Sequence, residues 1–403
     1  MLQLNLKKKR NIDLLFKDLS KKDDLIPEEK VKLLILRDLL RLNWKINFGD
    51  NKIIVTPPKK YDKDTIRKSM SHKRIESIQK NVDWIKKNLE FARANLANGE
   101  EVLESKIRPV IEVCDTPKQH SLFRMYRYYW SSAHSEYVGR RIKLIIRDAA
   151  LPNKPVIGIA ALGSSIIHIP DRDNWVGWDK KLRTKNLIYA MDAYVIGALP
   201  PYNNLLGGKL ISYILASNEV RKIYRKKYKN KITLIDKKKA NDLVCIFTTS
   251  LYGKSAQYDR MKYKSKLLYV PIGETRGFGT LHLSGETLNA MLELLRSKKI
   301  SVNNKFGDGP SWSMRVIRTV GDILGFDSNF LLQHSFKRGI YAIPLARNSR
   351  EFLRGEHKNP KYYNRSLNNL VLFWKKRWLN NRKQNTEIIE KVREFKKSDF
   401  TVF

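Results

Sequence analysis

Acidic and aromatic side chains crowd the segment Asp171–Asp179, which holds three acids, one arginine and two tryptophans within nine residues. Carboxylates at this spacing can bind a metal ion or act as general acid and base. In the structural alternative, Arg172 pairs with an acid and the tryptophans cover the core. Asp192 lies in an otherwise apolar segment, where a carboxylate needs a partner or a function. Asp173 and Asp192 are therefore our candidate catalytic residues.

A glycine pair, Gly207-Gly208, follows a predicted buried strand at Leu187–Leu199 and opens a predicted helix. Free backbone amides at a helix start suit a phosphate or pyrophosphate, and glycine lets a ligand approach closely. In the alternative, the glycines serve only a tight turn. The cofactor itself stays unknown, and no metal ligands are assigned. The predicted cofactor-binding residues are Asn203, Asn204, Leu206, Gly207, Gly208 and Lys209.

Two further loops carry weaker signals. Thr248–Arg260 contains Gly253-Lys254-Ser255, which is only the end of a phosphate-binding Walker A motif, so an N-capped helix start is an equal alternative. Within it, Tyr252 is a third candidate catalytic residue, and Tyr258 is a candidate for the pocket wall. Gly273–His282 fits either a loop close to a ligand or DNA, or a plain hairpin. The seven histidines show no metal-ligand spacing and are expected to be structural or at the surface.

The charge of the chain points to a polyanionic partner. Its 403 residues include 79 Lys and Arg against 40 Asp and Glu, a net charge of +39, and nucleic acid is the commonest cellular polyanion. Three basic stretches, Thr116–Arg147, Arg221–Lys239 and Lys358–Thr386, interleave cations with aromatic or apolar residues. Stretches of this kind suit single strands or distorted duplex, and their alternative is a solvated face. The predicted nucleic-acid contacts are Arg124, Arg127, Arg140, Arg141, Arg172, Lys237, Lys238, Lys239, Lys254, Arg276, Lys375 and Arg377.

Hydrophobic patterning predicts an α/β (α+β) protein in three parts. Residues 1–110 are expected to be helical, 111–283 to form an α/β domain, and 284–403 to be basic and mainly helical, with a winged-helix variant as one reading. Among single elements, we predict two strands with a turn over Val156–Ile169, a short helix at Ser255–Tyr263, and one long helix from Leu367 to Phe395.

Composition also excludes several classes. Hydrophobic residues make up 42% of the chain, which excludes wholesale disorder, and two distant cysteines exclude a disulfide scaffold and a four-cysteine zinc site. No apolar run is long enough for a membrane span, and the N-terminus lacks a secretory signal, so a cytoplasmic location without membrane contact is expected.

Eight segments together carry a family resemblance: Leu122–Ser132, Tyr137–Arg141, Arg172–Trp178, Met191–Leu210, Thr249–Ser255, Gly273–Gly279, Gly307–Trp312 and Arg338–Leu345. Over roughly residues 105–355 they resemble the DruA family. This resemblance implies bacterial anti-phage defence in a Druantia system, beside a helicase-like partner.

A looser resemblance is to GNAT acyltransferases, whose pyrophosphate loop Gln/Arg-x-x-Gly-x-Gly/Ala also lies between a strand and a helix. The segment Asn204–Lys209 keeps the glycine at the fourth position and differs at the first and sixth. The resemblance implies a GNAT-like central mixed sheet with flanking helices.

Together these observations predict an anti-phage defence protein that binds DNA and acts on or senses foreign DNA through a GNAT-like pocket. One alternative is a non-catalytic DNA sensor or loader for a helicase partner. The other is a metal-dependent enzyme that cleaves DNA or transfers strands. Whether the protein is an enzyme, and its oligomeric state, stay open.

Overall fold

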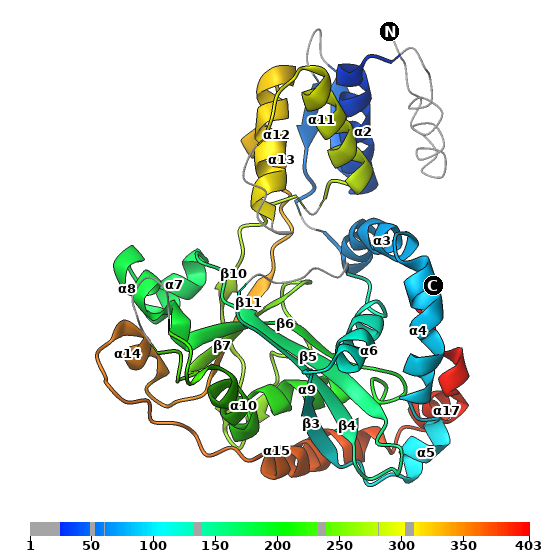
Figure 1. The fold of residues 1–403 in the computed structure, drawn as a ribbon, viewed down its shortest axis with the longest axis vertical. Coiled ribbons are helices and arrows are strands. Elements are labelled where there is room, and N and C mark those ends of the chain that lie inside the picture. The colour runs from blue at the N-terminus through cyan, green and yellow to red at the C-terminus, as the bar shows by residue number, and fades with distance from the viewer. Residues whose placement is uncertain are drawn as a thin grey trace. The chain divides into compact units, whose positions relative to one another are not determined.

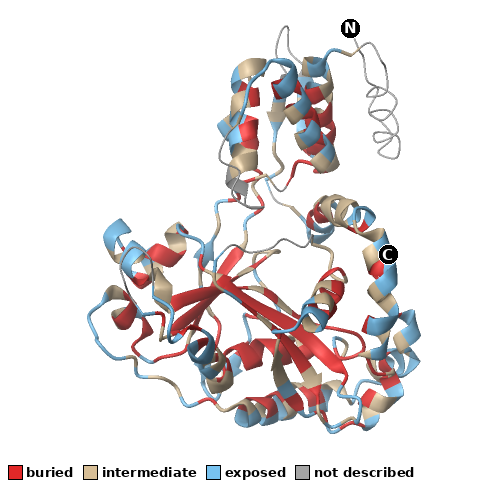
Figure 2. Ribbon diagram, viewed as in Figure 1, coloured by how far each residue is buried: buried red, intermediate tan, exposed pale blue. Residues whose placement is uncertain are grey.

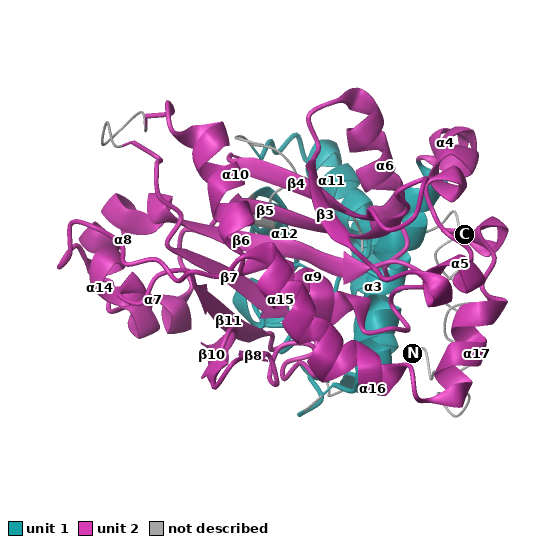
Figure 3. Cartoon of the chain, turned by 90° about the horizontal axis from the view of Figure 1, so that it is seen from below, with its two compact units in different colours: residues 1–80, 131–136, 276–336 teal, residues 81–130, 137–275, 337–403 magenta. Residues whose placement is uncertain are grey.

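The computed structural model describes residues 25–48, 53–59, 61–132, 139–232, 239–280, 282–302 and 310–403. The chain forms two compact units, coloured separately in Figure 3. Unit 1 comprises residues 1–80, 131–136 and 276–336, and unit 2 comprises residues 81–130, 137–275 and 337–403. Both units therefore combine segments that are distant in the sequence.

Unit 2 is built on a seven-stranded mixed sheet flanked by helices (Figure 1), which confirms the predicted fold class. Neighbouring strands are antiparallel except β6 and β7, which are parallel. In spatial order the strands are β10 (Val270–Glu274), β11 (Gly339–Pro344), β7 (Cys245–Ser250), β6 (Ala190–Ala198), β5 (Val156–Ser164), β4 (Arg141–Asp148) and β3 (Pro109–Val113).

Helices cover both faces of this sheet because the side chains on both sides of its central strands are mostly apolar and buried. Figure 2 shows these strands in the buried colour. Along β4, Ile142, Leu144 and Ile146 enter the core that also contains α9 (Gly207–Leu215). Side chains alternate along a strand, so Lys143 faces the opposite side. There its ammonium lies 5.4 Å from the ring of Phe123 in α6 (Pro117–Arg127), which places α6 on that face.

The remaining helices of unit 2 surround the sheet. Helix α15 packs on α9, and α17 packs on α5. Helices α7, α8 and α14 gather near one edge of the sheet (Figure 1). Their bounds are α4 (Val82–Ala94), α5 (Gly99–Glu104), α7 (Pro170–Val176), α8 (Lys180–Asn186), α10 (Asn218–Tyr228), α14 (Ser349–Arg354), α15 (Leu367–Trp374), α16 (Asn380–Arg382) and α17 (Thr386–Glu394).

Unit 1 is a helical body with a two-stranded hairpin. Helix α11 packs on α2 and on α12, and α12 packs on α13. Side chains of Asp62, Ser284 and Asp327 cap the starts of α3, α11 and α13. The elements are α2 (Pro27–Arg41), β1 (Lys45–Phe48), β2 (Ile53–Thr56), α3 (Lys63–Gln79), α11 (Gly285–Ser297), α12 (Pro310–Leu324) and α13 (Ser328–Leu332).

Three predicted elements are wrong. Val156–Ile169 is one strand followed by a loop, because Gly158 lies inside β5, where a Cβ would clash with the Gly197 carbonyl of β6. Ser255–Tyr263 forms turns and the two-residue strand β8 (Lys262–Tyr263) instead of a helix. The predicted helix from Leu367 to Phe395 is interrupted by a π-helical turn at Lys375–Leu379 and by a break before Thr386.

Candidate functional site

A polar cluster lies at the connection from β5 to α7. Asp173 is buried, and its Oδ1 accepts hydrogen bonds from Arg172 Nε (2.9 Å) and Nη2 (2.6 Å). Its Oδ2 accepts from Arg183 Nη1 (2.9 Å) and lies 2.8 Å from His168 Nδ1. The His168 side chain is 60% exposed, whereas Asp173 is 4% exposed. A buried carboxylate thus orients an imidazole at the surface.

Asp192 lies in β6 on the inner side of the same loop. Its Oδ2 accepts a hydrogen bond from the backbone N–H of Ile166 (2.9 Å). Among the described residues, its Oδ1 makes no hydrogen bond of good geometry, and the buried Ser165 hydroxyl lies close enough to this carboxylate to favour its charged form. Burial raises the pKa of Asp192 to about 6, since the charged form is poorly solvated there. Burying this carboxylate costs free energy of folding, and that cost is a reason to suspect that Asp192 has a function.

Arg172 also belongs to this cluster. Its side chain is fully buried, and besides Asp173 it donates to the carbonyl oxygens of Ile166 and Ile167. The structure therefore brings Arg172, Asp173 and Asp192 together around the loop Ser165–Ile169. Sequence reasoning had selected the two acids but missed His168. The available signal was its position five residues before Asp173.

The glycine loop lies at the other end of β6, so the structure does not bring it together with Asp192. A Cβ on Gly207 would come within 2.6 Å of the Tyr202 carbonyl oxygen, which makes close packing a sufficient reason for glycine there. A Cβ on Gly208 would make only ordinary contacts. Asn203 is exposed, and its Oδ1 accepts from the N–H of Asn204.

C-terminal elements cover this loop. The carbonyl of Asn204 accepts from Arg382 Nε (2.9 Å), and that of Leu206 accepts from Trp374 Nε1 (3.2 Å). Lys209 Nζ donates to the carbonyls of Ala256 (2.7 Å) and Gln257 (3.2 Å) and lies 4.4 Å from the Trp378 ring. Burial lowers the pKa of Lys209 to about 8. These contacts pack the loop against the C-terminal elements.

The two predicted tyrosines differ in setting. Tyr252 is half-buried on the turn after β7. Tyr258 is buried and stacks on Tyr269 with ring centroids 4.9 Å apart. Tyr258 thus packs against Tyr269 and is not part of the Asp173 cluster.

The predicted nucleic-acid contacts that the structure describes fall into three groups by burial. Arg127 and Arg172 are buried. Arg124, Arg140 and Lys375 are partly buried, and each donates to protein oxygens, those of Asn81, of Ile188 and Ala190, and of Lys106. Lys237 and Lys238 lie outside the described residues. The exposed ones are Arg141, Lys239, Lys254, Arg276 and Arg377.

Helix α10 presents a strongly basic surface. Its buried face is made by Val220, Tyr224 and Tyr228, and the Tyr228 hydroxyl donates to the carbonyl of Arg141 (2.9 Å), which brings the exposed Arg141 beside the helix. We call the exposed cations of α10 the α10 basic face. No ion pair found among the described residues includes any of these cations. The face comprises Lys222, Arg225, Lys226 and Lys227.

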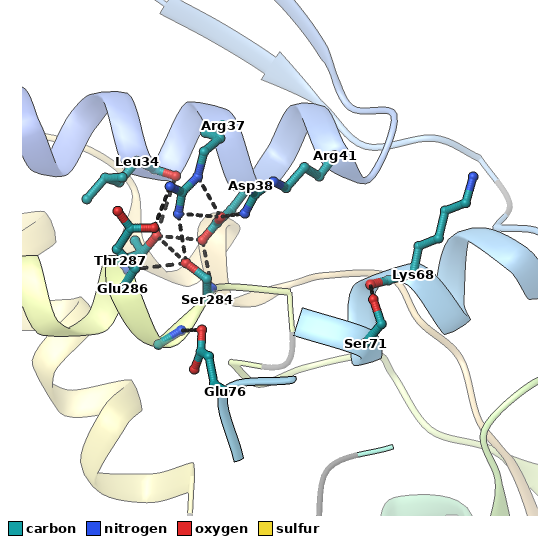
Figure 4. Close-up of polar contacts among 11 residues, drawn as sticks. Leu34, Arg37, Asp38, Arg41, Lys68, Ser71, Glu76, Ser284, Glu286 and Thr287 are labelled. Atoms are coloured by element: carbon teal, nitrogen blue, oxygen red, sulfur yellow. Dashed lines mark hydrogen bonds and ion pairs between the residues drawn. The ribbon is translucent and has the colours of Figure 1, made fainter. Parts of the chain in front are cut away.

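Unit 1 has a separate polar network around the buried Asp38 of α2 (Figure 4). Asp38 Oδ2 accepts from Ser284 N (2.7 Å) and Thr287 Oγ1 (2.5 Å), and its Oδ1 lies 3.3 Å from guanidinium nitrogens of Arg37 and Arg41. Glu76 accepts from the N–H of Gly285. Carboxylates from α2 and α3 thus satisfy the N-terminus of α11, which is a structural role.

A cavity of about 10 Å³, near the volume that one water needs, adjoins this network. His282 lines it, with both ring nitrogens lacking a partner among the described residues, and burial lowers its pKa to about 4. Across the described ranges, no group of three His, Cys, Asp or Glu side chains could hold a metal ion. In that same part of the chain, no helix is long and apolar enough to span a membrane.

Fold and sites together define a mixed α/β protein with a basic helix surface and a buried acid–arginine cluster. The family model described as Druantia protein DruA matches residues 60–355. The Druantia protein DruA of Escherichia coli (strain UMEA 4076-1) is 36% identical over 296 residues, which is 72% of each chain. No solved structure matches. The chain belongs to the DruA family of Druantia proteins and is thus a bacterial anti-phage defence protein.

Proposed function

We propose that this defence protein binds DNA electrostatically through the α10 basic face. The observation that carries the proposal is the set of four exposed cations of α10 that have no acidic partner among the described residues. Cations without partners attract the phosphate backbone and release counterions when they bind it. The net charge of +39 supports the same partner.

The expected result is a steep salt dependence. If about six phosphates are neutralised, the plot of log affinity against log salt has a slope of roughly −5. The measurement is fluorescence anisotropy of the purified full chain with labelled single-stranded and duplex oligonucleotides. A DNA affinity that does not change with salt concentration would contradict the proposal.

Charge reversal tests the assignment to α10. Lys226→Glu with Lys227→Glu is expected to weaken DNA binding on the order of ten-fold and to make the salt slope shallower by about two. The matched control is Lys86→Glu with Lys87→Glu, two exposed lysines on α4 of the same unit, which changes the net charge equally. Equal losses in both variants would contradict a specific role for α10.

The role of the protein after DNA binding has two candidates. A sensor or loader that passes DNA to a helicase-like Druantia component is supported by the glycine loop, whose contacts serve packing. A DNA-processing activity is supported by Asp192, whose Oδ1 makes no hydrogen bond of good geometry in the described chain. The metal-dependent version of that activity gains no support from the side chains described.

The GNAT-like pocket remains part of the proposal. Two observations support it. Along the chain, β6 is followed by the glycine loop and then by α9, and β6 pairs in parallel with β7. That pairing ends at Ala193 and Thr248, although β6 continues to Ala198. The ligand that co-purifies with the chain, whether an acyl-CoA, a nucleotide, a divalent ion or none, would decide whether the pocket binds one.

A further inference from the structure

Two consecutive isoleucines project from the loop between β5 and α7. Ile166 is 50% exposed and Ile167 is 73% exposed. The other exposed large apolar side chains of the described residues lie singly along the chain. Exposing two neighbouring β-branched side chains gives up the free energy that their burial would supply, so the pair calls for an explanation.

Buried charged groups hold this loop in place. The N–H of Ile166 donates to Asp192 Oδ2 (2.9 Å), and the carbonyl of Ile167 accepts from Arg172 Nη2 (3.1 Å). Arg172 also donates to the carbonyl of Ile166. Burying a carboxylate and a guanidinium is costly, and here both groups fix the backbone of two exposed residues. The loop is thus presented at the surface in a defined conformation.

Cations adjoin the loop on α8. Arg183 of this helix donates to Asp173 Oδ2 and contacts His168 Nδ1 (2.9 Å), which joins α8 to the end of the loop. Lys180, Lys181 and Lys185 are exposed on the same helix. A rigid apolar tip beside a basic helix is complementary to nucleic acid, because phosphates meet the cations while apolar side chains enter between the bases.

We propose that Ile166 and Ile167 form a wedge that inserts between stacked bases of DNA held by the cations of α8. The proposal rests on the proposed function, DNA binding. It gives Arg172, Asp173 and Asp192 a positioning role, and it predicts preference for DNA whose stacking is already weakened, such as a duplex with a mismatch.

The test uses the full chain and a duplex with 2-aminopurine, whose fluorescence rises on unstacking. We expect the wild type to raise the fluorescence several-fold and to bind a mismatched duplex about ten-fold more tightly than a matched one. Ile166→Ser with Ile167→Ser should lose both effects at an unchanged salt slope, because no charge is removed. Leu372→Ser, at a residue that is 62% exposed on α15, is the control and should retain both.

The outcomes separate the wedge from DNA binding itself. A double variant that keeps the fluorescence change and the mismatch preference overturns the wedge and leaves electrostatic DNA binding intact. A wild type that binds no DNA overturns both. If the double variant binds and unstacks DNA normally but loses phage protection, the isoleucines contact a protein instead, which also overturns the wedge. Unchanged thermal unfolding of the double variant verifies that it folds.

Discussion

Asp38→Ala is expected to lower the free energy of unfolding of unit 1 by about 3–5 kcal/mol. The carboxylate is buried and accepts from the backbone of Ser284 and the hydroxyl of Thr287, while Arg37 and Arg41 lie beside it. Its removal leaves Glu286 as the remaining carboxylate partner of the buried Arg37 and leaves the N–H of Ser284 at the start of α11 unsatisfied. Breaking a buried pair in this way costs far more than losing a surface pair.

The measurement is hydrogen exchange of the α2 and α11 amides in the full chain, which reports the opening free energy of this unit. Asp64→Ala is the control, because Asp64 pairs with Arg67 at the exposed start of α3 and its loss should change little. Similar protection in the two variants would show that the Asp38 network does not stabilise the unit.

Asp192→Asn is expected to stabilise the protein at pH 7 by about 3 kcal/mol, since the pKa of Asp192 is raised from 3.8 to about 6. The folded state keeps its proton up to about pH 6, whereas the unfolded state releases it near pH 4. Wild-type stability therefore falls as pH rises through this window, and the asparagine variant lacks that loss. Asparagine can still accept from the N–H of Ile166.

Denaturant unfolding between pH 4 and 7 measures this difference. Asp148→Asn is the matched control: Asp148 is equally buried, but accepts from Arg108 N, Ala150 N, Ser105 Oγ and Tyr202 Oη. The control should be destabilised, because an amide nitrogen would replace an oxygen that accepts bonds. Destabilisation of Asp192→Asn as well would mean that its carboxylate has a structural role.

Phage protection in cells that carry the complete Druantia system then distinguishes chemistry from structure. A stabilised Asp192→Asn protein that no longer protects indicates that the buried charge is kept for function. A stabilised protein that still protects indicates that neither charge nor proton at this position is needed. Stability and defence together therefore separate the two roles of Asp192.

Local patterns predict part of the sheet. Leu187–Leu199 is predicted as a buried strand because its run of apolar residues indicates burial, and β6 occupies most of this range. Gly158 was misread as a turn residue, since the sequence does not reveal that Gly197 of the neighbouring strand approaches it. The π-helical turn at Lys375–Leu379 was equally hidden, because it does not alter the helical pattern.

The site was predicted in part. Asp192 was recognisable as a charge in an apolar strand, and the alternative reading of Arg172, pairing with an acid, is the arrangement found with Asp173. The role of His168 depends on a hydrogen bond across the start of α7, which no spacing rule anticipated. The burial of Arg127 was not predictable either, since net charge does not tell which guanidinium groups face solvent.

The order of strands has a consequence for biosynthesis. Strand β11 pairs with both β7 and β10, yet residues 276–336, the last segment of unit 1, are translated between β10 and β11. A nascent chain on the ribosome therefore carries β7 with one edge uncovered until Pro344 has emerged. An unpaired apolar edge is prone to aggregation, so soluble yield should respond to slower translation or to added chaperones.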